Sequence, residues 1–181
     1  MIAVLKPADD RRRARTRNAL LGAAQTLFSA KSVDGVSIDD IVQRAEVAKG
    51  SFYNHFSDKD DIAREVARLV REEVETQVNA NNDGVSDPAD RMARAVSTFI
   101  RFALTDPERA RVLLRLHPGA TLAASAANAG LRSDLKRGLA AGLYTDITVE
   151  AAVPYVMGIC LSTMSLALEG TRPKRFAGEV E

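Results

Sequence analysis

The chain has 181 residues, 46% of them hydrophobic and 27% charged, so it is long enough for one large or two small domains with a packed core. The formal net charge is only +1. Residues 1–59 hold 10 Lys/Arg against 7 Asp/Glu, and residues 60–181 hold 15 Lys/Arg against 17 Asp/Glu. Charge alone therefore does not indicate a nucleic-acid partner. The single cysteine excludes an intramolecular disulfide and suits a reducing compartment.

The first predicted helix follows a basic segment. Residues 1–10 show no periodic pattern and are predicted to form a loose arm, after which five arginines occur between residues 11 and 17. Such a run fits either a solvated helix start or an arm that binds phosphate groups. Apolar side chains then recur on one face of a helix predicted over residues 16–30: Leu20, Ala23, Ala24, Leu27 and Phe28.

A capping box predicts the start of the second helix. Ser37 is followed three residues later by Asp40, a pattern in which each side chain satisfies a backbone N–H group near the other residue. Three apolar residues then share one face: Ile38, Ile41 and Val42. The apolar phase changes at residues 45–47, so this helix is expected to end there.

A second short helix is predicted from about Ala48 to His55. Its buried stripe has helical spacing, with Ala48, Phe52 and Phe56 at i, i+4 and i+8. The opposite face carries Gly50, Tyr53 and Asn54, flanked by Lys49, Ser51 and His55. This face offers a cation, a phenol, an amide, a hydroxyl and an imidazole but no acid, which suits phosphate oxygens and base edges. The two helices indicate a DNA-binding helix-turn-helix, although the pattern alone leaves open an ordinary pair of core helices with a solvated outer face.

The segment from residue 45 to residue 59 resembles the recognition segment of the TetR/AcrR family of transcriptional repressors. The resemblance covers about Arg17 to Ala63 and rests on residues that fall in family register: Lys49-Gly50, Phe52-Tyr53, His55-Phe56 and Lys59. It implies an all-α, homodimeric protein that releases operator DNA when a small molecule enters its C-terminal domain.

The resemblance also implies a set of DNA-binding residues. Contacts to the duplex are expected from the exposed side of the second short helix: Lys49, Gly50, Ser51, Tyr53, Asn54 and His55. Ser37 and Lys59 are expected to bind phosphates at two helix N-termini, and the arginine run, including Arg17, to act as a phosphate-seeking arm. Glu46 stands where the family turn usually has glycine, which predicts a strained or reshaped turn, and Asn54 replaces a more usual aromatic residue.

A second capping box, Ser57 with Asp60, predicts a long helix to about Asn79. Its apolar side is formed by Ile62, Val66, Leu69, Val70, Val74 and Val78. Such a helix is roughly 30 Å long and is expected to join the two halves of the protein as one rigid lever. Lys59 in its first turn is a phosphate contact that the neighbouring aspartates oppose.

Two helices of the second half are predicted from the same start signal. Asp87-Pro88 and Asp106-Pro107 each have the form of an N-cap followed by proline at the first helical position. These helices are expected to end near Leu104 and Leu116, the second being stopped by His117-Pro118-Gly119.

Two more helices complete the predicted fold. An alanine-rich helix is expected within residues 121–142, and Thr148 opens a helix to about Glu169. Pro154 should kink this last helix unless it starts later, and the residues from Thr171 onward read as a tail.

These elements predict an all-α fold, because no segment has the two-residue period of a strand. Residues 1–59 are predicted to form an N-terminal arm and a helix-turn-helix DNA-binding domain, and residues 60–181 a helical effector-binding and dimerisation domain with a C-terminal tail. Small residues of the last two helices permit close contact in a dimer but also suit an ordinary core: Ala123, Ala127, Gly138, Gly158, Ser162 and Ser165.

The apolar surface of the second half also predicts a ligand cavity between helices. The candidate wall residues are Phe99, Phe102, Leu113, Leu114, His117, Tyr144, Tyr155, Met157 and Met164. Each of these residues could instead be an ordinary part of the packed core, and His117 could also be a turn residue. The set predicts an apolar or aromatic effector with one or two hydrogen bonds.

The sequence does not predict an enzyme. The two histidines lie far apart, no glycine-rich phosphate loop or metal-ligand spacing occurs, and no metal or cofactor is expected. Asp134, Asp146 and Glu150 could meet in space, but nothing marks them as an acid–base pair. A protein of this fold that has lost operator binding and acts as a protein-interaction module is a further alternative.

The sequence also predicts a soluble, cytoplasmic protein. The longest apolar run, near residues 151–161, contains Pro154 and Gly158 and is shorter than the about 20 residues that a spanning helix needs. The N-terminus has no apolar core long enough for a signal peptide. Cys160 lies in this apolar segment and is expected to be an inert core thiol rather than a redox sensor.

Overall fold

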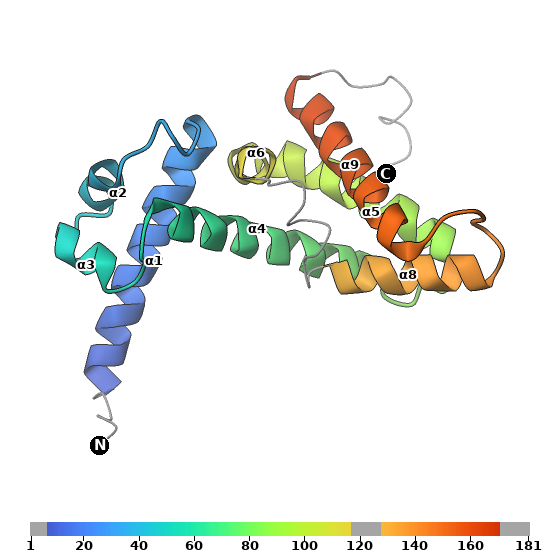
Figure 1. Ribbon diagram of the computed structural model, residues 1–181, viewed down its shortest axis with the longest axis horizontal. Coiled ribbons are helices and arrows are strands. Elements are labelled where there is room, and N and C mark those ends of the chain that lie inside the picture. Colours follow the sequence, from blue (N-terminus) through green and yellow to red (C-terminus); the bar gives the residue numbers. More distant parts are fainter. Residues whose placement is uncertain (1–6, 117–127, 171–181) are drawn as a thin grey trace. The chain divides into compact units, whose positions relative to one another are not determined.

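The computed structural model describes residues 7–116 and 128–170, and every regular element in these two ranges is a helix (Figure 1). The predicted all-α fold class is therefore confirmed. The chain divides into two compact units, the first ending at Leu69 and the second beginning at Val70. Helix α4 (Lys59–Asn81) runs through this division, and the predicted domain boundary between residues 59 and 60 stays a prediction.

Helix α1 (Pro7–Ala30) begins well before the predicted start at residue 16. The arginine run therefore lies on a helix, and the prediction of a loose arm is wrong for residues 7–10. Proline is favoured at the first helical position, and the carboxylates of Asp9 and Asp10 in the first turn stabilise a helix N-terminus. The predicted inner face packs on α2 (Ile38–Arg44) through buried residues: Leu20, Ala23, Ala24 and Phe28.

Helix α2 starts at the predicted capping box. The Ser37 hydroxyl accepts a hydrogen bond from the Asp40 backbone N–H at 3.1 Å, and the Asp40 carboxylate accepts one from the Ser37 backbone N–H at 2.8 Å. Ile41 and Val42 are buried as expected, and the helix ends before residues 45–47.

The turn after α2 contains a left-handed residue. Glu46 has a φ of 55°, a backbone conformation that costs an L-residue about 1–2 kcal/mol. The Val47 N–H donates to the Val42 carbonyl at 3.0 Å and closes the turn. The strain expected where the family has glycine is thus present in the backbone of Glu46.

Helix α3 (Lys49–Tyr53) is shorter than predicted. Ala48 is its N-cap, with an extended backbone and an exposed side chain, so the prediction that Ala48 shares the buried stripe is wrong. A residue that precedes the first turn does not follow the helical period. Phe52 and Phe56 are buried as predicted, and the Phe56 N–H donates to the Phe52 carbonyl at 3.0 Å.

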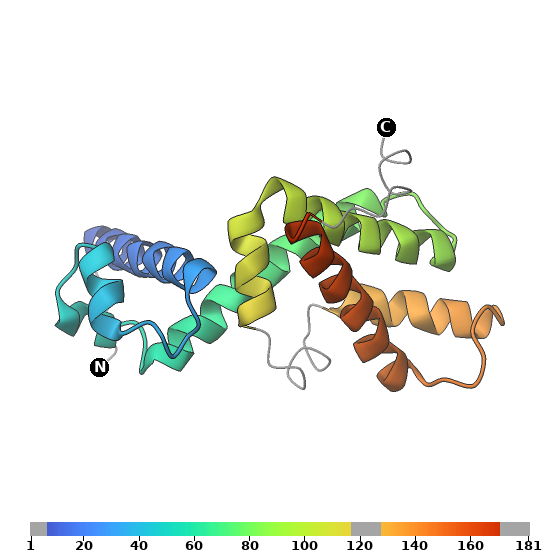
Figure 2. The same cartoon turned by 90° about the horizontal axis from the view of Figure 1, so that it is seen from above.

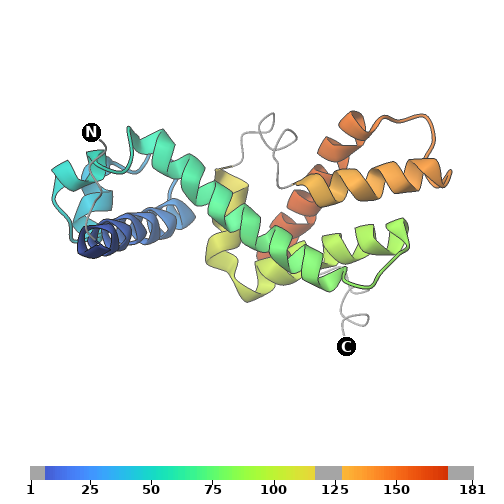
Figure 3. The same cartoon turned by 90° about the horizontal axis from the view of Figure 1, so that it is seen from below.

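The start of α4 differs by one residue from the predicted capping box. Asp58 accepts a hydrogen bond from the Asp61 N–H at 2.7 Å, and the Asp61 carboxylate accepts one from the Ser57 N–H at 3.0 Å. Asp61 rather than Asp60 therefore reaches back, because Lys59 is the first helical residue. Figure 3 shows α4 as one continuous ribbon. Five residues of its predicted apolar side are buried, namely Ile62, Val66, Val70, Val74 and Val78, whereas Leu69 is exposed.

Helices α5 (Pro88–Thr105) and α6 (Pro107–Arg115) begin at the two predicted Asp-Pro signals. The Asp87 carboxylate accepts hydrogen bonds from the N–H groups of Ala89 and Asp90, and Asp106 accepts one from Arg109. The predicted stop signal after α6 lies outside the described residues.

Helices α8 (Ala129–Ala140) and α9 (Val149–Leu168) are joined by a loop over residues 141–148 (Figure 2). Thr148 caps α9 as predicted by accepting a hydrogen bond from the Ala151 N–H at 3.2 Å. Pro154 lies inside α9, so the alternative of a later helix start is wrong. Helix α5 is the centre of the second unit, because it packs on α6, α8 and α9.

Helix α9 is long and apolar enough to cross a bilayer, which corrects the prediction that the apolar run is too short. The predicted apolar run ended before the serine and threonine residues that follow residue 161. Within a helix, however, such hydroxyl groups can donate to the backbone, as Thr163 does to the Ile159 carbonyl at 2.8 Å. Only 28% of the apolar window is buried. One such helix is weak support for a membrane location.

Candidate nucleic-acid interface and ligand cavities

The polar face of α3 lies at the surface of the first unit. Tyr53 is 55% exposed, and its ring meets the fully buried Phe52 ring edge-on, with 5.4 Å between the centroids. A Cβ added to Gly50 would meet nothing within 4 Å, so the face is open to close approach. The six expected contact residues of this segment are exposed or partly exposed: Lys49, Gly50, Ser51, Tyr53, Asn54 and His55.

An acid from the preceding helix lies beside this face. The Lys49 ammonium group pairs with the Asp39 carboxylate of α2 at 2.8 Å, and this hydrogen bond raises the pKa of Lys49. The expectation of a face without acids therefore holds for α3 itself but not for its surroundings. Because both side chains are largely exposed, the pair is weak and can open when a stronger partner approaches Lys49.

The two residues expected at helix N-termini occupy different environments. Ser37 is exposed, but its hydroxyl already donates to the Asp40 carboxylate at 2.7 Å, so it can donate to a phosphate only by leaving this partner. Lys59 is half-buried at the first position of α4, with Asp60 and Asp61 beside it in the first turn. Both residues stay candidates for phosphate binding.

Arg17 is only partly exposed, because its side chain is engaged within the first unit. Its guanidinium pairs with the Glu65 carboxylate of α4 at 2.5 Å, and its Cζ lies 4.9 Å from the centroid of the Phe56 ring. The side chain thus ties α1 to α4 beneath the end of α3. The arginines that precede it on α1 are the exposed cations of the run: Arg11, Arg12, Arg13 and Arg15.

Arg13 connects α1 with the end of α3. Its Nη2 donates to the Asn54 carbonyl at 3.4 Å. Burial, with Arg13 and Arg17 nearby, lowers the pKa of His55, so the imidazole is neutral at physiological pH and can accept a hydrogen bond. The contact of Arg13 was not predicted, because it joins residues 41 positions apart in the sequence through tertiary packing.

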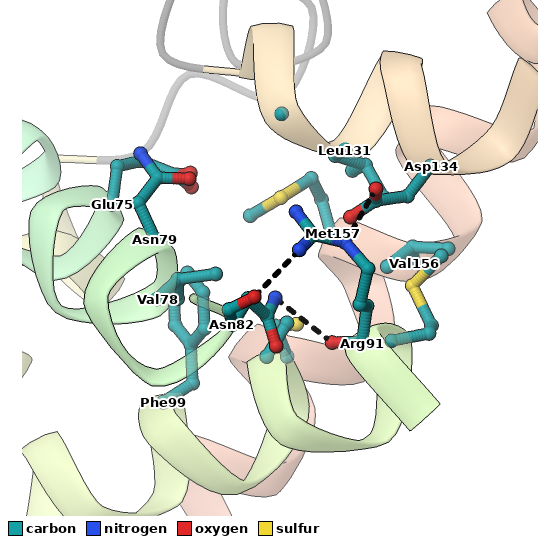
Figure 4. Close-up of a pocket in the computed structure, with 14 residues that line it drawn as sticks. Glu75, Val78, Asn79, Asn82, Arg91, Phe99, Leu131, Asp134, Val156 and Met157 are labelled. Carbon is teal, nitrogen blue, oxygen red and sulfur yellow. Dashed lines mark hydrogen bonds and ion pairs between the residues drawn. The ribbon is translucent and has the colours of Figure 1, made fainter. Parts of the chain in front are cut away.

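Two cavities lie in the second unit. The interior cavity, between α4, α5, α8 and α9, has a volume of about 20 Å³, which is room for one water molecule (Figure 4). Its polar wall residues are Glu75, Asn79, Asn82, Arg91 and Asp134. The apolar groove has a volume of about 180 Å³ and is lined by Met92, Leu135, Leu139, Tyr144, Ile147, Ala152, Tyr155 and Val156.

The structure separates the wall residues that the sequence suggested. Phe99 and Met157 line the interior cavity, whereas Tyr144 and Tyr155 line the apolar groove. The other five do not line either cavity or lie outside the described residues. Phe102, Leu113 and Met164 are buried in the core, Leu114 is partly buried, and His117 is not among the described residues.

A buried polar cluster was missed. Arg71 is only 5% exposed; it pairs with Glu75 and donates to Asn128 Oδ1 at 2.7 Å, while its Cζ lies 5.1 Å from the Phe99 ring centroid. Burial lowers the pKa of Arg71 and raises that of Glu75. The sequence contains these residues as an ordinary i, i+4 pair beside the valines of α4, a pattern that is typical of a solvated face.

Arg91 forms a second polar anchor in the wall of the interior cavity (Figure 4). Its Nε pairs with Asp134 of α8 at 2.7 Å, and its Nη1 donates to the carbonyls of Asn82 and Val85 at 2.8 and 3.2 Å. Arg91 thereby ties the loop after α4 to α5 and α8.

The single thiol matches its expected environment. Cys160 is buried and unpaired, and burial raises its pKa to about 12. No group of three potential metal ligands occurs among the described residues.

The exposed surface of α9 is largely apolar. Tyr155, Ile159 and Leu166 are 69%, 53% and 42% exposed, and Gly158 and Ser162 lie exposed among them. For Gly138 of α8 the alternative of an ordinary core position applies, because Gly138 is buried and a Cβ there would collide with the Tyr144 ring. Ala123 and Ala127 lie outside the described residues.

Two family profiles match the chain. Residues 20–66 match the profile described as "Bacterial regulatory proteins, tetR family", and residues 87–178 match "Tetracyclin repressor-like, C-terminal domain". The second match alone covers just over half of the chain.

Curated relatives are transcriptional regulators of the helix-turn-helix type. The chain is 30% identical over 98 residues to HbdR of Aromatoleum sp. (strain CIB), a segment that is 54% of this chain and 42% of the relative. It is 31% identical over 104 residues to AcrR of Shigella flexneri, which is 56% of this chain and 47% of the relative. The chain thus spans about half the length of the curated relatives it matches.

Solved structures share the fold. A protein from Shewanella sp. PV-4, described as a tetR family transcription regulator, superimposes with a TM-score of 0.79 at 18% identity, covering 90% of this chain and 89% of the other. The complex of RolR with resorcinol superimposes with a TM-score of 0.57 at 24% identity, covering 91% and 83%.

Proposed function

This chain belongs to the tetR family of bacterial regulatory proteins, and we propose that it is a homodimeric repressor that a small-molecule effector releases from operator DNA. Family membership makes it a DNA-binding transcriptional regulator and not an enzyme. The observation that carries the proposal is the outward face of α3 and its C-cap: Tyr53 and the C-cap residue Asn54 are exposed, while Phe52 and Phe56 are buried.

The exposed side chains of α3 suit the major groove. The Asn54 amide can pair in two-pronged fashion with adenine, and Lys49 can donate to guanine once it leaves Asp39. A good base contact of this kind is worth about 1–3 kcal/mol. Ser51, Tyr53 and His55 add hydrogen-bonding groups, and Ser37, Lys59 and the exposed arginines of α1 supply candidates for phosphate binding. Arg17 joins that set only if a phosphate displaces Glu65 from it.

Dimerisation is supported by the exposed apolar side chains of α9. Tyr155, Ile159 and Leu166 occur at helical spacing, and Gly158 between them permits a second helix to approach closely. A two-fold pair of such helices buries this surface with the same residues from each protomer. A dimer also provides two recognition helices, which must reach major grooves about 34–36 Å apart.

Effector binding is assigned to the predicted effector-binding and dimerisation domain, residues 60–181. The apolar groove, with a volume of about 180 Å³, exceeds the about 150 Å³ of an engineered apolar cavity that accepts benzene. Tyr144 and Tyr155 at this groove add phenol groups for one or two hydrogen bonds. RolR, which shares the fold, binds resorcinol, a small aromatic diol. An apolar or aromatic effector fits these features.

Release is proposed to act through α4, because this helix belongs to both compact units. A ligand that shifts α4 changes the separation of the two DNA-binding domains, residues 1–59 of each protomer, and a coupling of about 1–3 kcal/mol is typical. Such a regulator works in the cytoplasm, where the operator is, and its lone buried thiol suits that compartment.

The proposal is tested by titrating the purified protein into labelled DNA from upstream of its own gene at two salt concentrations. Two protomers per operator, with affinity that falls steeply as salt rises, are expected. A ligand screen by thermal shift follows, and compounds that stabilise the free protein should weaken operator binding. Equal affinity for the upstream DNA and a scrambled duplex would contradict the assignment.

A further inference from the structure

Arg71 in the interior of the second unit has buried hydrogen-bond donors without acceptors. Its polar contacts come from Nη2, which pairs with Glu75 and donates to Asn128 Oδ1 at 2.7 Å and Met157 Sδ at 3.2 Å. Among the described residues, Nε and Nη1 have no acceptor, although both atoms are buried. The side chain of Arg71 is 6% exposed, so water does not readily take this place.

These unsatisfied N–H donors of Arg71 destabilise the folded protein when no ligand is bound. A guanidinium stays protonated in proteins, so it cannot relieve the cost by losing its charge. A buried polar network that is only partly satisfied is less favourable than either a complete network or an apolar core. A ligand that supplies the missing acceptor completes the network, and the folded protein gains stability in proportion to its occupancy.

The surroundings define which ligand fits. Three neighbours of Arg71, namely Glu75, Phe99 and Met157, line the interior cavity, so Arg71 lies directly behind its wall. Phe99 and Met157 offer apolar contact, and the flexible Met157 side chain can move to enlarge a cavity that now has room for one water molecule.

We propose that Arg71 binds the carboxylate of the effector, a small acid with an apolar or aromatic body, and that the Glu75 carboxylate occupies part of this position when no ligand is bound. The proposal rests on the proposed function, because it assigns the charged group of the same effector. One negative charge matches the single guanidinium, and displacement of Glu75 by a monoanion keeps one carboxylate on Arg71 throughout. Burial already raises the pKa of Glu75, so the displaced carboxylate can take up a proton and become neutral.

The test compares carboxylates with their uncharged amides on the free protein, without DNA. Benzoate, hexanoate and octanoate, each beside its amide, are titrated by calorimetry and by thermal shift. For the parent protein at least one acid is expected to bind about tenfold more tightly than its amide, as one charge-assisted hydrogen bond supplies.

Substitutions of Arg71 and Glu75 distinguish a ligand-binding role of this buried pair from a purely structural one, because only a ligand-binding role changes the affinity for carboxylates in the directions given below. Glu75→Gln removes the internal competitor and is expected to tighten carboxylate binding by about tenfold. Arg71→Gln together with Glu75→Gln leaves no unpaired buried charge, so this variant is expected to fold but to bind acid and amide equally. The matched control is Asp90→Asn with Arg94→Gln, an exposed i, i+4 pair on α5, which should change neither affinity.

Two results would overturn the proposal: no acid preference in either the parent or Glu75→Gln, or an acid preference that survives in the double variant. Operator release is measured separately with the same compounds. Acid binding through Arg71 without release would leave this site intact and contradict the proposed effector mechanism. Release by amides as well as by acids would contradict this site and leave the mechanism standing.

Discussion

At the scale of single residues, Glu46 sets how α3 is presented. In the turn between α2 and α3, the backbone of Glu46 adopts the left-handed conformation with a φ of 55°. Its side chain is exposed, so burial of the side chain does not compensate for this strain. The strained backbone angle is held by the turn itself, which the hydrogen bond from the Val47 N–H to the Val42 carbonyl closes.

Glu46→Gly is expected to be more stable than Glu46→Ala by about 1 kcal/mol, because only alanine keeps a Cβ in the left-handed region. The free energies of unfolding of both variants are measured by urea denaturation. A glycine variant that is less stable than the alanine variant would show that this backbone angle carries no strain.

Cys160 is expected to resist alkylation in the folded protein. Its pKa is raised to about 12 by burial, so hardly any thiolate is present at neutral pH. Iodoacetamide labelling followed by mass spectrometry should modify Cys160 only after addition of denaturant. Rapid labelling of the native protein would mean that the thiol is accessible and reactive.

The exposure of Tyr53 and Asn54 could be predicted from the sequence, whereas the burial of charged side chains could not. Tyr53 and Asn54 follow from the local helical period around Phe52, which needs no knowledge of other elements. Arg71 is buried because Asn128 and Met157, far along the chain, are brought onto it by tertiary packing. The same applies to the pair of Lys49 with Asp39, since its two members come from different helices.

At the scale of elements, helix starts were predictable where a side chain caps its own helix. Ser37, Asp87 and Asp106 each accept a hydrogen bond from a backbone N–H of the first turn, so the signal is contained in four residues. The start of α1 was missed because residues 9–18 bury no side chain, and an apolar stripe was the guide. Helix α3 was drawn too long because Ala48 fits the apolar period without lying on the helix.

Ala48→Ser is expected to stabilise the protein by about 1 kcal/mol. Ala48 is an N-cap with extended backbone and no side-chain hydrogen bond, and a serine hydroxyl there can accept one from the first turn of α3. The control Ala30→Ser places the hydroxyl at the last residue of α1, where no such N–H is free, and should not stabilise. Thermal unfolding compares the two variants, and an Ala48→Ser variant no more stable than the control would contradict this geometry.

At the scale of the whole molecule, each unit carries a surface that the proposed function requires. The first unit exposes the polar side chains of α3, and the second exposes Tyr155, Ile159 and Leu166 on α9. Helix α4 belongs to both units, which gives ligand binding in one a covalent connection to the other. The exposed apolar side chains on α9 are the surface assigned to the proposed dimer contact.

If α9 forms the proposed dimer contact, Ile159→Lys is expected to yield a monomer, because a charge within that apolar contact would lack a partner. Analytical ultracentrifugation measures the mass of the parent and the variant. The control Leu104→Lys changes an exposed leucine of α5 and should leave the dimer intact. A monomeric parent, or a dimeric Ile159→Lys variant, would place the dimer contact elsewhere or exclude it.

Fluorescence anisotropy with labelled upstream DNA measures whether the outward face of α3 binds operator DNA. Tyr53→Ala and Asn54→Ala, which change exposed side chains and should leave the fold intact, are expected to weaken binding by about 1–3 kcal/mol each. The control Gln77→Ala alters an exposed residue of α4 and should bind like the parent. If both α3 variants bind the operator as tightly as the parent, this face is not the one that meets DNA.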